Sequence, residues 1–406
     1  MTSTTGAARA AHLHPSDLRA LARIATDATA GVVDLVESMH MSIAPAALSR
    51  HASLPYRALR GATRLVGGGA EMSLAQVTEL LGRRDNSPQR ASALAIINGL
   101  WGDYLHNIDS PLALPMSFRY GDAALAPPRR KLLILVHGLC NDGRTWERND
   151  SDAFAAAPGL PAAPGLPAAR DYGDALARDL GYSPVYLTYN TGLHISTNGR
   201  ALAMMIDALL AAWPCPVDEI ALLGHSMGGL VARSACFYGE MAGSEWVDRL
   251  RSIVCLGSPH HGVPLEQRGN LLNVLLDSTP FLAPFSRLGK RRSAGITDLR
   301  YGNLVDEDWL GRDRFANGRD DRCLVAPTPG VRYFAVAATL GRRADSVATR
   351  LLGDGLVPLD SALGRHPSPA RCNTFDEANT WIAYGMSHQD LLARPEVYER
   401  IALWLA

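Results

Sequence analysis

The stretch EIALLGHSMGGLVARSACFY, residues 219–238, decides the fold. Its first five residues form an apolar, strand-like run, and the run that starts at Gly229 has the pattern of a helix. Between them lies GHSMG, in which Gly224 and Gly228 flank Ser226 at a distance of two residues. A serine at a sharp strand-to-helix turn is forced outward in strained backbone geometry, and glycines on both sides prevent clashes at the bend. The pattern therefore predicts an exposed nucleophile at Ser226; the alternative is an ordinary glycine-rich turn.

Apolar runs alternate with helical patterns on both sides of this turn, as in an open, mostly parallel sheet. We expect helices over 200–213 and 229–238 and a last helix that begins at Pro395. Runs that are apolar on both faces belong to sheets with helices on each side. The expected strands are 114–120, 131–136, 184–189, 219–224, 252–257, 331–338 and 380–384.

The alternation starts at Leu114, so we expect a catalytic α/β domain over 114–406 and a helical extension over 1–113. The extension should contain a long amphipathic helix over 15–43 and further helices near 73–81 and 89–105. It carries no catalytic signature. A packing appendage, a dimerisation element and part of a substrate channel remain open as its role.

Two insertions interrupt the α/β pattern. The tandem repeat APGLPA-APGLPA, residues 157–168, is a proline-rich segment typical of a surface loop. Residues 263–309 are far longer than a usual connection and include the apolar stretch NLLNVLLDSTPFLAPF, residues 270–285. We interpret 263–309 as an inserted cap or lid, which favours a lipophilic substrate. Whether its apolar face packs permanently on the core or contacts a lipid surface is open.

Composition excludes several classes of function. Lysine and arginine number 40, as do aspartate and glutamate, so charge gives no reason to expect a nucleic-acid partner. No uninterrupted apolar run reaches the roughly 18 residues of a membrane-spanning helix. The N-terminus lacks the pattern of a secretory signal, and the 6 cysteines form no CxxC pair. These features predict a cytoplasmic protein without a transmembrane segment.

A second motif, HGL at residues 137–139, follows the strand-like run LLILV. Acyl transfer requires two N–H donors for the oxyanion of a tetrahedral intermediate. The backbone of Met227, directly after the serine, would supply one, and that of Leu139 the other. His137 is then expected to hold the loop in place.

A serine needs a base, and the base needs a carboxylate to orient it. In enzymes with this serine turn, the chain order is serine, acid, histidine. Asp354 lies between two glycines in GDGLVP, after the strand predicted over 331–338. His388 follows the last predicted strand and precedes the terminal helix. The rival acids are Asp345, Asp360 and Asp376, and the rival histidines are His260, His261 and His366. We expect His260 and His261 to shape the floor of the pocket.

The motifs HGL, GHSMGGLVAR, GSPHHG, GDGLVP and SHQDLL, in this order, resemble the bacterial lipase and esterase branch of the α/β-hydrolases. Enzymes that act like lecithin–cholesterol acyltransferase or like the deacylase of glycosylphosphatidylinositol anchors share several of them. The resemblance covers about residues 114–406. It implies a catalytic triad of Ser226, Asp354 and His388, an oxyanion hole at Leu139 and Met227, and no metal or organic cofactor.

The leading hypothesis is hydrolysis of a lipophilic carboxylic ester through an acyl-enzyme at Ser226. An acyltransferase would use the same intermediate with an alcohol as acceptor. The non-enzymatic alternative is a binding protein that retains only the hydrolase fold.

Overall fold

The computed structural model describes most of the chain beyond the N-terminal region. The amphipathic helix expected over 15–43, the helix near 73–81, the tandem repeat and the apolar stretch 270–285 lie outside the described residues. Those residues are 88–120, 128–147, 171–263, 292–315, 320–343, 353–372 and 375–406.

The chain divides into two compact units. One comprises Met1–Leu94 and Leu105–Ala113; the other comprises Ala95–Tyr104 and Leu114–Ala406. In the first unit, a turn follows helix α4 (Pro88–Asn107), with Ser110 N–H donating to the Leu105 carbonyl oxygen at 2.9 Å. The second unit holds the sheet and includes residues 95–104, which the sequence had suggested as part of the extension. The boundary at residue 113 stays a prediction.

Among the described residues, seven strands form one sheet in the order β1-β3-β2-β4-β5-β6-β7, and of these pairings only that of β1 with β3 is antiparallel. The mostly parallel α/β sheet predicted from the sequence is therefore confirmed, and the expected strands agree with the observed ones within a few residues. The strands are β1 (Ser117–Tyr120), β2 (Lys131–Val136), β3 (Tyr182–Thr188), β4 (Glu219–His225), β5 (Leu250–Leu256), β6 (Arg332–Thr339) and β7 (Thr380–Tyr384).

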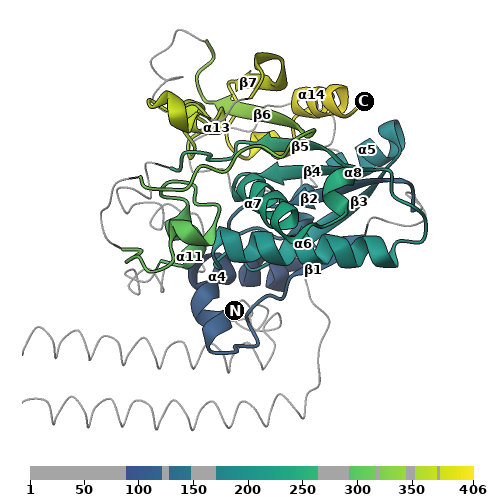
Figure 1. The fold of residues 1–406 in the computed structure, drawn as a ribbon. Helices are drawn as coiled ribbons and strands as arrows, with labels where there is room; N and C mark the ends of the chain where they lie inside the picture. Colours follow the sequence, from purple (N-terminus) through teal and green to yellow (C-terminus); the bar gives the residue numbers. More distant parts are fainter. Residues whose placement is uncertain are drawn as a thin grey trace, which may run out of the picture. The chain divides into compact units, whose positions relative to one another are not determined.

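Helices cover both faces of the sheet (Figure 1). Successive side chains of a strand point to opposite faces, so each strand packs against helices on both sides. Leu133 and Leu135 of β2 belong to a core cluster that also contains residues of α5 and α14. Their neighbours Leu132 and Ile134, equally buried, point to the opposite face, where α7 packs on β2, β4 and β5. Besides part of α4, the described residues of this unit form the α-helices α5 (Tyr172–Leu180), α6 (Ile195–Ala212), α7 (Met227–Ala242), α8 (Trp246–Arg249), α11 (Ala294–Asp298), α13 (Leu359–Ala362) and α14 (Pro395–Leu405).

The strand order places a topological switch point at β2. The chain passes from β2 to β3 on one side and then returns to β4 on the other side of β2. In open α/β sheets, the crevice for ligands lies outside the carboxyl ends of the strands at such a point. The HGL loop follows β2 and Ser226 follows β4, so both predicted parts of the site lie at this position.

The described part of the expected cap, residues 292–309, is packed into the body of the sheet unit. Residues 293–300 are all buried, from Ser293 to Arg300. The Ser293 hydroxyl donates to the Gly99 carbonyl oxygen at 2.6 Å, and Val263 N–H donates to the Leu299 carbonyl oxygen at 2.9 Å. The cap or lid over 263–309 stays a prediction, because residues 264–291 lie outside the described residues.

Core packing of β2 predicts a stability difference between two leucine substitutions. Leu133 is 0% exposed, whereas Leu403 on α14 is 68% exposed. Leu133→Ala leaves a cavity and should lower the free energy of unfolding by about 2–5 kcal/mol. Leu403→Ala should change it by no more than about 0.5 kcal/mol. Urea unfolding followed by circular dichroism measures both, and equal effects would contradict this packing.

Candidate active site

The backbone at Ser226 has the strain that the sequence pattern predicts. Ser226 has φ 54° and ψ −125°, a backbone conformation that residues other than glycine rarely adopt. It lies between the last residue of β4 and the first residue of α7. Its backbone N–H donates to the Leu256 carbonyl oxygen at 2.8 Å, which ties the turn to the end of β5. The Ser226 side chain is partly exposed and makes no hydrogen bond to another described residue.

The flanking glycines are required by close approach rather than by their own φ. A Cβ at Gly224 would lie 2.5 Å from the Gly229 nitrogen. A Cβ at Gly228 would lie 2.1 Å from the carbonyl oxygen of Val136, at the end of β2. Contacts this short between a side chain and backbone cannot be relieved by a rotamer change. The two glycines thus allow α7 to start directly against β2 and β4.

Asp354 and His388, 34 residues apart in the sequence, form a buried hydrogen bond. His388 Nδ1 lies 2.6 Å from Asp354 Oδ2, and both side chains are at most 5% exposed. The other carboxylate oxygen of Asp354 accepts from the N–H groups of Leu356 at 3.0 Å and Val357 at 2.7 Å. The backbone N–H of His388 also donates a hydrogen bond to the backbone carbonyl oxygen of Asp354, at 3.0 Å. The acid is therefore fixed by its own loop, and the imidazole is fixed by the acid.

Two residues outside the predicted set bring His388 to the serine turn. His225, directly before Ser226, has its ring centroid 4.7 Å from that of His388, and His225 Nε2 lies 3.1 Å from the His388 carbonyl oxygen. A Cβ at Gly257 would lie 3.1 Å from His388 Nδ1. Gly257 follows Leu256, the partner of the Ser226 N–H. His225 is part of the motif GHSMG, but the sequence analysis used this motif to predict only the role of the serine.

The HGL loop lies against the serine turn. A Cβ at Gly138 would be 2.9 Å from the Ser226 Cβ atom, so glycine is needed here for close approach. Leu139 is the next residue, and Met227 opens α7. The first N–H groups of a helix lack intrahelical acceptors and carry partial positive charge. Leu139 and Met227 thus lie on two segments that meet at Ser226, while their role as oxyanion donors remains a prediction.

Cys140, directly after Leu139, connects the HGL loop to α4. Cys140 has φ 61°, and its N–H donates to Thr191 Oγ1 at 3.2 Å. A Cβ at Gly99 would lie 2.3 Å from the Cys140 Sγ atom. The HGL loop is thus supported by residues 95–104, which explains why this part of α4 belongs to the sheet unit.

His137 is buried and holds the HGL loop, as the sequence suggested. Its ring stacks on Tyr189 with centroids 4.5 Å apart, and the Tyr189 hydroxyl donates to the His137 carbonyl oxygen at 2.8 Å. His137 Nδ1 lies 2.9 Å from the Gly138 carbonyl oxygen. Burial lowers the pKa of His137 to about 4, so the ring is neutral at pH 7.

The rival residues lie elsewhere. Asp360 and Asp376 are exposed, and Asp345 lies outside the described residues. His260 and His261 line a pocket of about 200 Å³ together with Arg233, Arg322 and Arg371. The lining of this pocket includes none of Ser226, Asp354 and His388.

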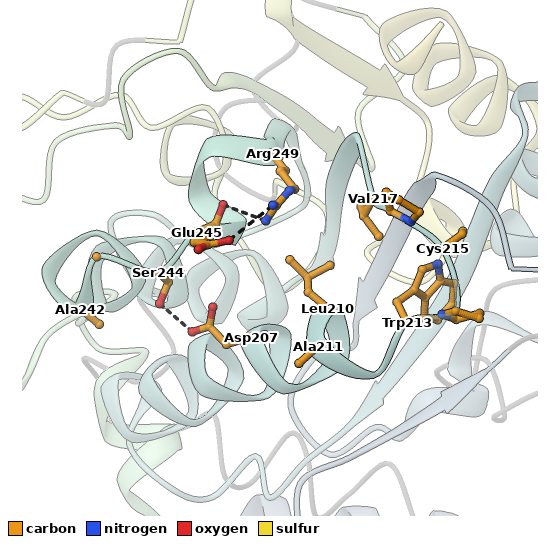
Figure 2. Close-up of a pocket in the computed structure, with 13 residues that line it drawn as sticks. Asp207, Leu210, Ala211, Trp213, Cys215, Val217, Ala242, Ser244, Glu245 and Arg249 are labelled. Carbon is orange, nitrogen blue, oxygen red and sulfur yellow. Dashed lines mark hydrogen bonds and ion pairs between the residues drawn. The ribbon is translucent and has the colours of Figure 1, made fainter.

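A larger pocket, of about 760 Å³, also lies away from Ser226 (Figure 2). It is formed by the C-terminal end of α6, the segment before β4 and the loop between α7 and α8, and Asp207, Trp213 and Arg249 are among its lining residues. Ser226 lies at the other end of β4. Among the described residues, no group of three or more His, Cys, Asp or Glu side chains is arranged to bind a metal ion. In the same part of the chain, no helix has the length and apolar character needed to cross a membrane.

Residues 133–308 match the family model described as a PGAP1-like alpha/beta domain. The matched stretch is less than half of the chain and contains the HGL loop, Ser226 and the GSPHHG motif. The chain has the α/β-hydrolase fold. Within this superfamily it resembles the deacylases of glycosylphosphatidylinositol anchors, and the match supports a lipase- or esterase-like hydrolase. No curated protein matches the sequence.

Several solved structures are similar to this chain. The mature form of a Bacillus licheniformis lipase is 17% identical with a TM-score of 0.44, over 71% of this chain and 98% of that chain. A Pyrococcus furiosus esterase is 15% identical with a TM-score of 0.40, over 71% and 84% of the two chains. A Legionella pneumophila phospholipase is 17% identical with a TM-score of 0.32, over 57% and 44%.

Backbone strain at Ser226 predicts which of two substitutions at this position gives the more stable protein. Ser226→Ala keeps the Cβ atom in the unfavourable φ, whereas Ser226→Gly removes it. Relief of strain outweighs the extra entropy of an unfolded glycine, so Ser226→Gly should be more stable than Ser226→Ala by about 1 kcal/mol. Thermal unfolding of the two variants measures the difference. A lower melting temperature for the glycine variant would show that the turn is not strained.

The neutral state of His137 predicts acid sensitivity. Between pH 6.5 and about 4, an unfolded His137 binds a proton that the folded residue does not, so stability falls as the pH decreases through this range. The loss from His137 should reach about 3 kcal/mol. His137→Asn keeps an N–H donor for the Gly138 carbonyl but does not titrate. Its free energy of unfolding should therefore depend less steeply on pH over this range, as urea titrations at several pH values would measure. An unchanged slope would contradict the burial of a neutral imidazole.

Proposed function

We propose that the protein is a serine hydrolase of carboxylic esters, with Ser226 as nucleophile, His388 as general base and Asp354 as the acid that orients it. The observation that carries the proposal is the buried 2.6 Å hydrogen bond between His388 and Asp354, beside the strained turn at Ser226. A structural ion pair would not need an imidazole packed against the residue that precedes the serine. Here the His225 and His388 rings are 4.7 Å apart.

The hydrogen bond fixes which nitrogen of His388 can act. An ionised carboxylate only accepts hydrogen bonds, so Nδ1 carries the proton that is donated to Asp354. Nε2 of the neutral ring then has the free lone pair that a general base requires. His388 Nε2 accepts the proton of the Ser226 hydroxyl as its Oγ attacks the ester carbonyl carbon. The proton is then given to the leaving alcohol, whose C–O bond breaks.

The second half of the reaction uses the same groups. A water molecule loses a proton to His388 as it attacks the acyl carbon, and the acid is released as Ser226 regains its proton. Negative charge develops on the former carbonyl oxygen in both halves. The backbone N–H groups of Leu139 and Met227 would donate hydrogen bonds to this oxygen. The close approach of Gly138 to Ser226 supports this assignment.

We further propose a lipophilic ester as the substrate class. Two features support this: the apolar stretch 270–285, which the structure does not describe, and the resemblance to deacylases of glycosylphosphatidylinositol anchors. Both favour an acyl chain over a small polar ester.

Hydrolysis of p-nitrophenyl esters from acetate to palmitate tests the proposal. Ser226→Ala and His388→Ala should lower kcat by about 10⁶-fold, because the members of a triad act as a unit. Asp354→Asn should lower kcat by about 10⁴-fold, because an amide that donates to Nδ1 enforces the wrong tautomer. Activity that rises with chain length would support a lipophilic substrate.

Two rejected candidates serve as matched controls. Asp376→Asn removes an exposed carboxylate and His366→Ala a partly exposed imidazole, and both should leave kcat unchanged. Wild-type activity retained by Ser226→Ala would exclude the proposed mechanism. A wild type that is inactive with water but active with an added alcohol acceptor would identify an acyltransferase instead.

A further inference from the structure

The loop that follows β3 contacts both ends of the HGL loop. The Tyr189 hydroxyl donates to the His137 carbonyl oxygen at 2.8 Å. The Thr191 hydroxyl oxygen accepts from the backbone N–H of Cys140 at 3.2 Å. Tyr189 and Thr191 are 0% and 1% exposed, so little water competes for these two hydrogen bonds. Leu139 lies between them in the sequence, and the segment that carries its N–H is therefore held at both ends.

The peptide group between Gly138 and Leu139 is fixed as well. The Gly138 carbonyl oxygen accepts from the Asn141 N–H at 3.3 Å and lies 2.9 Å from His137 Nδ1. A carbonyl oxygen only accepts hydrogen bonds, so Nδ1 carries the proton that it donates. In a trans peptide the N–H points opposite to the C=O, so the Leu139 N–H points away from these two donors. No described residue accepts a hydrogen bond from this N–H, which agrees with its proposed role as an oxyanion donor.

The turn after Leu139 needs support from other segments. Cys140 has φ 61°, a backbone conformation that residues other than glycine rarely adopt. Such a conformation persists where the surrounding structure fixes it through several contacts. One contact is with Gly99, where a Cβ would lie 3.1 Å from the Cys140 nitrogen and Cα atoms. The hydrogen bond to the Thr191 hydroxyl is another, so its loss would loosen the turn that carries Leu139.

The loop after β3 is itself firmly attached. Asn190, between the two residues with hydroxyl groups, donates from Nδ2 to the Gly102 carbonyl oxygen of α4 at 2.9 Å. Its backbone carbonyl oxygen accepts from Asn198 Nδ2 in α6 at 3.0 Å. A Cβ at Gly295 in α11 would lie 2.1 Å from the Thr191 carbonyl oxygen. Three helices thus hold this loop, and its hydroxyl groups connect that fixed position to the HGL loop.

We propose that Tyr189 and Thr191 are positioning residues that aim the Leu139 N–H at the oxygen on which negative charge develops. The inference rests on the proposed function, because it concerns the oxyanion that forms when Ser226 attacks the ester. A donor stabilises an oxyanion only if it is already directed at the position that this oxygen takes in the transition state. Both hydroxyl groups act through the backbone of the HGL loop, and we assign neither a contact with the substrate. Their loss should therefore lower kcat and leave KM nearly unchanged.

Three substitutions test these hydroxyl groups with the ester that the wild type hydrolyses fastest. Thr191→Val keeps the shape of the side chain but removes the acceptor of the Cys140 N–H, and it should lower kcat about ten- to hundredfold. Tyr189→Phe keeps the ring that stacks on His137 but removes the hydroxyl group, and it should lower kcat about tenfold. Thr191→Ser keeps the hydroxyl group and should recover most of the activity that Thr191→Val loses.

A trifluoromethyl ketone with the same acyl chain provides a second readout. Ser226 Oγ bonds to its carbonyl carbon, the hydroxyl proton passes to His388, and the carbonyl oxygen becomes a stable oxyanion. The inhibition constant should rise in Thr191→Val by the same factor by which kcat/KM falls, because both depend on the oxyanion donors. A purely structural role would reduce only the amount of active enzyme, which does not change an inhibition constant.

Thr328→Val is the matched control for Thr191→Val. Thr328 is 5% exposed, and its hydroxyl oxygen accepts from the Tyr333 hydroxyl at 3.1 Å. It precedes β6 and so lies at the amino edge of the sheet, opposite the edge that carries Ser226. The kcat, KM and inhibition constant of this variant should equal those of the wild type. If Thr191→Val fails to fold, the kcat and inhibition constant of Tyr189→Phe decide the question.

The outcomes separate this inference from the proposed function. Esterase activity that Ser226→Ala retains, or a wild type that neither hydrolyses esters nor transfers their acyl group, would overturn both. A wild type whose activity requires Ser226, combined with an unchanged kcat in Thr191→Val and Tyr189→Phe, would overturn the positioning role alone. A lower kcat with an unchanged inhibition constant would overturn it as well and leave the two hydroxyl groups as structural contacts.

Discussion

The positive φ of Ser226 is the constraint on which the arrangement of the site depends. A helix that follows a parallel strand normally requires a longer connection, yet α7 starts one residue after β4 ends. This is achieved only because Gly224 and Gly228 allow backbone contacts that a Cβ would block. The strain is compensated by the surrounding sheet, since β4 lies between β2 and β5 with paired strands on both sides.

The sheet then determines which other segments reach the serine. Loops that follow neighbouring parallel strands meet at one edge, so the HGL loop after β2, Gly257 after β5 and Asp354 after β6 gather there although they span more than 200 residues of sequence. His388 comes from the loop after β7 and is held by Asp354. Each of these loops contributes one part of the site, and the rigid strands before them fix the distances between the loops.

Sequence reasoning could predict what depends on local pattern. The strands β2 and β7 agree with the expected residues because their apolar runs end at polar or glycine-containing turns. It could not predict that residues 95–104 support Cys140 or that residues 293–300 are buried, because both depend on contacts between segments far apart in the chain. For the same reason it could not predict that His260 and His261 face arginines, in a pocket whose lining includes none of Ser226, Asp354 and His388.

Histidines of this protein lie beside charged groups of opposite sign. His388 lies against the carboxylate of Asp354, with its Nδ1 atom 2.6 Å from Oδ2. His260 and His261 lie against arginines, and burial together with these charges lowers their pKa values, to about 4 for His261. They therefore remain neutral and act only as hydrogen-bond donors and acceptors at pH 7. The two environments are close in the chain: Gly257, where a Cβ would lie 3.1 Å from His388 Nδ1, and His260 belong to the same loop after β5.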